Sequence, residues 1–112
     1  MEFYVVGVLH STGRGENIAI VQVTRDPFIA VRTALDIEKL GYRFNSETGV
    51  NVYRLELDRL YSKAVFKLFK CLDTLATEYP VIFSRSKYCG VWENKWHDPD
   101  LERQFTLINI PS

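Results

Sequence analysis

The stretch FYVVGVLHSTGRGENIAIVQVTRDPFIAVRTALDIEKLG, residues 3–41, decides the fold class of this 112-residue chain. Its first segment, residues 2–10, is β-rich and apolar on both of its alternating sets of side chains. That pattern is typical of an inner strand that is covered on both faces. Two glycines in the following turn allow positive φ angles, so residues 18–24 are expected to form the return strand of a hairpin.

A helix is expected directly after this hairpin. Asp26 can cap free backbone N–H groups, and Pro27 fits the first helical turn, where its missing N–H costs nothing. We place the end of the helix at Gly41, because glycine readily adopts the left-handed conformation that follows a helix. Glu38 falls inside the apolar arc, and we expect it at the rim of the core, since an unpaired buried charge is costly.

The rest of the chain continues the alternation of strand and helix patterns. The expected elements are a strand at 50–57 with one solvated face, a helix at 60–79 with a regular apolar seam, and strands at 81–83, 88–92 and 105–110. The order β-β-α-β-α-β-β-β predicts a single small α+β domain over residues 1–112, with a mostly antiparallel sheet and two helices packed on it. We expect both helices on one face, with a partner or dimer covering part of the other.

Composition narrows the class of protein. Fourteen basic and fourteen acidic residues cancel, which argues against a protein that grips nucleic acid through its overall field. Cys71 and Cys89 are the only cysteines, fewer than a secreted scaffold of this size usually carries. No signal peptide is visible, and no apolar run approaches the roughly 20 residues that span a bilayer. We expect a soluble cytoplasmic protein.

Phosphate and metal sites are not indicated. The glycine turn at residues 10–15 has the hydroxyls and flexible backbone of a phosphate cradle, but it leads into a strand, whereas a P-loop leads into a helix. His10, His97 and the two cysteines lack the spacings of zinc sites. We therefore expect no cofactor and no metal.

Two catalytic patterns are weak, so we expect the protein not to be an enzyme. Cys89, His97 and Asp98 form a local Cys-His-Asp set, although such triads are usually assembled from distant segments. Glu93 and Lys95 have the Glu-x-Lys spacing of metal-dependent nucleases, but the neighbouring elements do not follow the order of those enzymes. A small Cys hydrolase or nuclease is the third-ranked function.

Nucleic-acid binding is the second-ranked function. Lys63, Lys67 and Lys70 form one helical stripe, and Arg85 and Lys87 lie in a segment that interleaves cations with aromatic residues. Bases stack on aromatic rings while Lys and Arg contact phosphates. The plain alternative, a solvated helix face, is favoured by the zero net charge.

Protein interaction is the first-ranked function. Phe66 and Phe69 lie off the main seam of the predicted second helix, and Tyr88, Trp92 and Trp96 lie in a polar segment. Large aromatic residues are enriched among interface hot spots because they bury much area with few rotors. We therefore predict a non-enzymatic accessory or inhibitory protein that binds a protein partner or itself through these aromatics. Small motif-free chains of phages and mobile elements are often of this kind.

Overall fold

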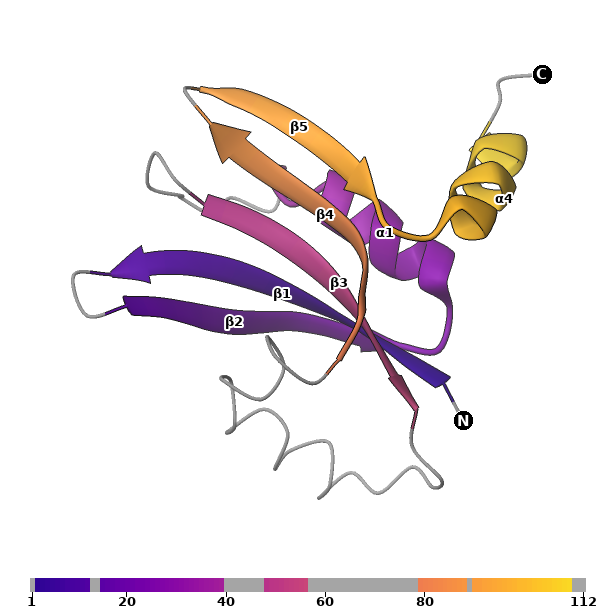
Figure 1. Cartoon of the computed structure of the whole chain (residues 1–112), viewed down its shortest axis with the longest axis horizontal. Helices are drawn as coiled ribbons and strands as arrows, with labels where there is room; N and C mark the ends of the chain where they lie inside the picture. Colours follow the sequence, from indigo (N-terminus) through magenta and orange to yellow (C-terminus); the bar gives the residue numbers. More distant parts are fainter. Residues whose placement is uncertain (1, 13–14, 40–47, 57–78, 89, 110–112) are drawn as a thin grey trace.

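Five strands pair antiparallel into one sheet in the order β2-β1-β3-β4-β5, and two helices lie on one side of it (Figure 1). The computed structural model describes residues 2–12, 15–39, 48–56, 79–88 and 90–109. The strands are β1 (Glu2–Thr12), β2 (Gly15–Thr24), β3 (Thr48–Glu56), β4 (Val81–Tyr88) and β5 (Val91–Trp96), and the helices are α1 (Pro27–Leu35) and α4 (Pro99–Asn109). The predicted α+β class with a mostly antiparallel sheet is confirmed.

Strand β1 is the inner strand that its sequence predicts. It pairs with β2 along one edge and with β3 along the other, and residues 3–8 are buried. Because successive side chains of a strand point to opposite faces, its apolar residues supply two separate cores. The first core lies between the sheet and α1, and the second lies on the opposite face.

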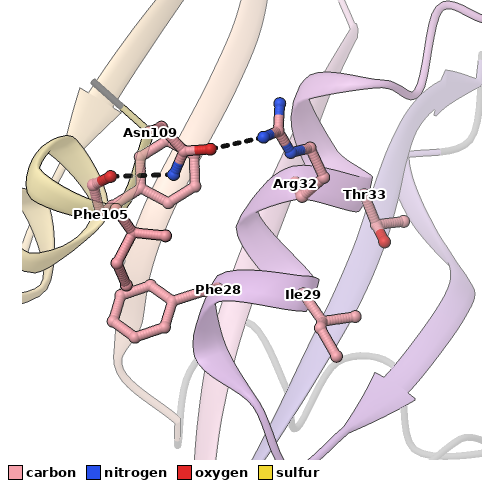
Figure 2. A pocket seen from close by; sticks show the side chains of 7 residues that line it. Phe28, Ile29, Arg32, Thr33, Phe105 and Asn109 are labelled. Atoms are coloured by element: carbon pink, nitrogen blue, oxygen red, sulfur yellow. Dashed lines mark hydrogen bonds between the residues drawn. The ribbon is translucent and has the colours of Figure 1, made fainter. Parts of the chain in front are cut away.

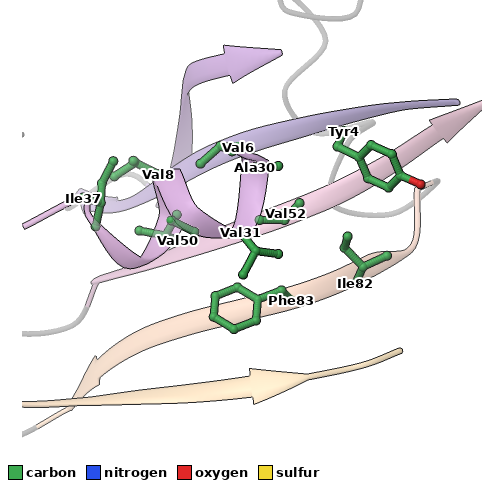
Figure 3. Packing of buried hydrophobic residues seen from close by; sticks show 11 residues of the cluster. Tyr4, Val6, Val8, Ala30, Val31, Ile37, Val50, Val52, Ile82 and Phe83 are labelled. Atoms are coloured by element: carbon green, nitrogen blue, oxygen red, sulfur yellow. The ribbon is translucent and has the colours of Figure 1, made fainter. Parts of the chain in front are cut away.

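The first core is built around α1, which crosses β1, β3 and β4 (Figure 3). Asp26 caps this helix as predicted, because its Oδ1 accepts a hydrogen bond of 2.8 Å from the backbone N–H of Phe28. Each fully buried valine or isoleucine here contributes about 1.5–3 kcal/mol through loss of apolar surface from water. The buried members are Tyr4, Val6, Val8, Ala30, Val31, Ala34, Ile37, Val50, Val52, Ile82 and Phe83.

The second core contains Phe3, Val5, Ile18, Tyr53 and Leu55, all buried. The predicted layout, in which a partner or dimer covers part of this face, stays a prediction. The solvated face predicted for β3 is wrong over most of its length. Both faces of this strand carry buried residues, since the sheet is covered on both sides there.

Strands β4 and β5 form a longer hairpin than their sequence predicts. Four consecutive polar residues, 84–87, follow Phe83, so the apolar signal ends there, yet pairing continues to Tyr88 opposite Val91. Gly90 in the turn has a φ of 82°, the left-handed region that favours glycine. A register shift in the β3–β4 ladder lets the adjacent residues Ile82 and Phe83 both enter the first core.

The end of α1 and the secondary structure of residues 105–110 both differ from the predictions. Helix α1 ends at Leu35, and Asp36 donates its backbone N–H to the carbonyl of Arg32, so the chain turns early and still places Ile37 in the core. Gly41 lies outside the described residues, as does nearly all of the predicted helix at 60–79. The strand predicted at 105–110 is wrong, because this segment belongs to α4.

Candidate protein-interaction surface

Helix α4 begins with the same Asp-Pro pair that begins α1. Asp98 Oδ1 accepts hydrogen bonds from the backbone N–H groups of Asp100, at 3.0 Å, and Leu101, at 3.3 Å. Pro99 occupies the first helical position, where proline is favoured. The strand prediction for residues 105–110 followed β-branched and apolar residue types. The cap outweighs that weak preference because it fixes the start of the helix.

An ion pair ties the start of α4 to the sheet. Arg54 of β3 contacts Asp98 Oδ2 at 2.7 Å, and its guanidinium lies 6.0 Å from the centre of the Tyr4 ring. The hydrogen bond from Arg54 holds the pKa of Asp98 below its ordinary value, helped by the two capping N–H groups and opposed by burial. Asp98 thus caps the N-terminus of α4 and also links this helix to the sheet through Arg54.

This arrangement separates the predicted Cys-His-Asp set. His97 Nε2 lies 3.2 Å from Ser84 Oγ, whereas the carboxylate of Asp98 is engaged by Arg54 and by the N-terminus of α4. Cys89 lies outside the described residues. The described groups therefore give no support to a triad.

The remaining contacts of α4 are made by one side of the helix. Phe105 packs beside Trp96, with ring centres 5.5 Å apart, and faces Phe28 of α1 at 6.4 Å. Further along, Arg32 donates a hydrogen bond to the side-chain oxygen of Asn109 (Figure 2). No residue of α4 is fully buried, so the helix rests on its neighbours along a narrow strip.

An open groove of about 290 Å³ lies between α1 and α4 (Figure 2). We call it the α1–α4 groove; its walls are Phe28, Ile29, Arg32, Thr33, Phe105, Ile108 and Asn109. Two of its apolar wall residues remain exposed: Ile29 is 49% and Ile108 is 64% accessible. Such apolar surface gathered in one place is typical of a binding site.

The groove also carries a positive charge. Within the described residues, Arg32 forms no ion pair, and its hydrogen-bond partner Asn109 is neutral. Arg32 thus has no carboxylate partner among the described residues, and it lies beside apolar walls. This combination favours a ligand that is mostly apolar and carries one acidic group.

The two tryptophans predicted for an interface have different surroundings. Both are half-buried and face the α1 side of the sheet. Trp96 packs edge-on against Phe83, with ring centres 4.8 Å apart, and against Phe105, so it joins the sheet to α4. Trp92 lies under Arg85, whose guanidinium carbon is 4.9 Å from the ring centre. Both rings therefore pack back onto their own chain.

Arg85 and Lys87, from the nucleic-acid alternative, both lie on β4. Arg85 pairs with Glu38 at 3.0 Å, and Glu38 lies at the rim of the core, as its sequence predicts. Lys87 is half-buried and stands opposite Trp92 in the β4–β5 ladder. The charge of Arg85 is thus already partly balanced by a carboxylate of the same chain.

Several sequence-predicted site residues cannot be placed. Those that lie outside the described residues are Lys63, Lys67, Lys70, Phe66 and Phe69. Tyr88 ends β4, where its backbone pairs with Val91. Among the described residues, no group of three or more His, Cys, Asp or Glu side chains is arranged to hold a metal ion. Over the same ranges, no helix has the length and apolarity to cross a membrane.

Sequence reasoning missed the α1–α4 groove because it missed α4. The signal was present in Asp98-Pro99, followed by apolar residues at Leu101, Phe105 and Ile108, which share one side of a helix. Comparisons with protein-family models, curated proteins and solved structures gave no significant match.

Proposed function

We propose that this chain is a non-enzymatic protein-binding module. Its ligand would be an amphipathic segment of another protein, whose apolar face enters the α1–α4 groove. The observation that carries the proposal is the exposure of Ile29 and Ile108 on the walls of a groove that also contains Arg32.

The energetics suit a groove of this kind. Complete burial of an exposed isoleucine side chain contributes about 1.5–3 kcal/mol, so Ile29 and Ile108, which are already partly covered, together represent up to several kcal/mol of unused binding free energy. The charge on Arg32 supports a ligand with a carboxylate near its apolar residues, since an ion pair fixes the register of an otherwise apolar contact.

The test begins with a partner captured from a lysate and purified, followed by titration against variants of this chain. Ile108→Asp should weaken binding at least about tenfold, because the groove would then carry a charge on its apolar wall. Gln104→Asp is the matched control, since it adds the same charge to an exposed position of α4 that does not line the groove. Equal affinities for the two variants, with unchanged circular dichroism, would exclude the groove.

Nucleic-acid binding remains the alternative. Two of its five predicted residues are described, and one of these, Arg85, is paired with Glu38. Recovery of material that disappears after nuclease treatment, with affinity that falls steeply with salt, would favour this alternative over the groove.

A further inference from the structure

Strand β5 is an edge of the sheet. It pairs with β4 alone among the described strands, and Figure 1 shows it at the margin, with α4 next to its C-terminal end. An edge strand presents a row of backbone N–H and C=O groups that can pair with another strand.

The β4–β5 ladder shows which residues of β5 present those groups. His97 donates its backbone N–H to the carbonyl of Ile82 at 2.9 Å, in the same register as the ladder. Hydrogen-bonded and non-hydrogen-bonded pairs alternate along an antiparallel ladder. Counting back from His97, Trp96, Asn94 and Trp92 occupy the non-hydrogen-bonded positions of the β4–β5 ladder, so their backbone groups point away from β4.

The two residues that alternate with Trp92, Asn94 and Trp96 along β5 carry opposite charges. Glu93 and Lys95 are exposed, and they share the face of β5 that lies opposite α1. Within the described part of the chain, neither forms an ion pair. A negative and a positive charge therefore stand two residues apart on one face of an unpaired edge.

This spacing is self-complementary in one register. If two copies of β5 pair antiparallel with Asn94 opposite Asn94, Glu93 of each copy faces Lys95 of the other, and the outward backbone groups meet one another. Sliding the strands by two residues places Glu93 against Glu93 or Lys95 against Lys95. Sliding the strands by one residue places the outward-pointing backbone groups of one copy opposite residues whose N–H and C=O groups already bond β4.

We propose that two copies of this chain associate through β5, in a two-fold antiparallel pairing centred on Asn94. The two sheets join into one continuous sheet, linked by about six backbone hydrogen bonds and by two Glu93–Lys95 ion pairs. The shared interface is isologous, as expected of a two-fold dimer. It is separate from the α1–α4 groove and does not depend on the proposed function.

Charge reversal tests the pairing and its register. Sedimentation equilibrium of the purified chain across the micromolar range should show a monomer–dimer equilibrium. Glu93→Lys and Lys95→Glu should each raise the dissociation constant at least about tenfold, because like charges then face each other. The double variant should dimerise like the wild type, and an equimolar mixture of the two single variants should form a heterodimer.

Other results overturn the proposal. A wild-type chain that stays monomeric over this range excludes the dimer. Single variants that dimerise as well as the wild type, or a double variant that stays monomeric, exclude this register. Ile108→Asp should dimerise normally, so that failure of the groove and failure of the β5 pairing are told apart.

Discussion

Replacing Trp96 with alanine should separate structural from binding roles among the aromatic residues. Sequence reasoning predicts that Trp92 and Trp96 are both interface residues, whose removal leaves the fold intact. In the structure, Trp96 lies between Phe83 of β4 and Phe105 of α4, with ring centres at 4.8 Å and 5.5 Å. Its loss should therefore weaken the attachment of α4 to the sheet.

The magnitude follows from these contacts. Each aromatic pair contributes about 0.5–1.5 kcal/mol beyond area burial, which gives about 1–3 kcal/mol for the two. Truncation of a fully buried tryptophan costs about 3–5 kcal/mol, and Trp96 is half-buried, so we expect a loss of about 2–4 kcal/mol. Trp92 is half-buried as well: it packs against the first core and stacks with Arg85, a contact worth about 0.5–1 kcal/mol at an exposed site. Trp92→Ala should therefore cost about 1–3 kcal/mol.

Urea denaturation followed by far-ultraviolet circular dichroism measures both losses. Hydrogen exchange would show in addition that amides of α4 lose protection in Trp96→Ala while those of β1 keep it. Trp92→Ala is the control, because it removes the same side chain from the same face of the same strand. The reasoning is refuted if Trp96→Ala lowers the protection of the α4 amides no more than Trp92→Ala does.

Two further perturbations test the core and the start of α4. At Gly7, an added Cβ would lie 2.7 Å from Cγ2 of Ile18 and 3.2 Å from Cε2 of Tyr53, and both of these residues are buried. Gly7→Ala should therefore lower the free energy of unfolding by about 1–3 kcal/mol, measured by urea denaturation. An unchanged denaturation midpoint would contradict this packing. Asp98 has a lowered pKa in the folded chain, so its ionised form stabilises the fold above the unfolded pKa of about 3.9, and this contribution is lost as pH falls through the lower folded value. The stability difference between wild type and Asp98→Asn, which keeps a capping oxygen, should therefore shrink with acidification, and a difference that stays constant with pH would argue against the Arg54 pair.

Local signals were enough to predict the centre of the fold. The sequence of β1 predicts a strand covered on both faces because both of its side-chain sets are apolar, and in the structure this strand has a core on each face. Helix α1 starts where Asp26 and Pro27 predict, since a cap is a short-range interaction that the sequence displays directly. The end of α1 was misplaced because Ile37 continues the apolar pattern after the helix has stopped.

The candidate groove could not be predicted in the same way, because it depends on contacts between distant segments. Arg32 and Asn109 are 77 residues apart in the chain, and nothing local to either indicates that they meet. The apolar residues at the end of the chain fit a strand or a helix equally well by type. The Asp98-Pro99 cap and the helical spacing of the apolar residues after it distinguish the two, but the ion pair of Asp98 with Arg54 is a non-local contact.

The two tryptophans show why residue type alone does not locate an interface. Trp92 and Trp96 share a strand, a face and a polar sequence context, so every local argument treats them alike. Their roles diverge because α4 brings Phe105 against Trp96, which gives that ring a partner on each side. The same helix exposes Ile108 in the α1–α4 groove, so the element that anchors one predicted hot spot also provides apolar surface proposed to bind a partner.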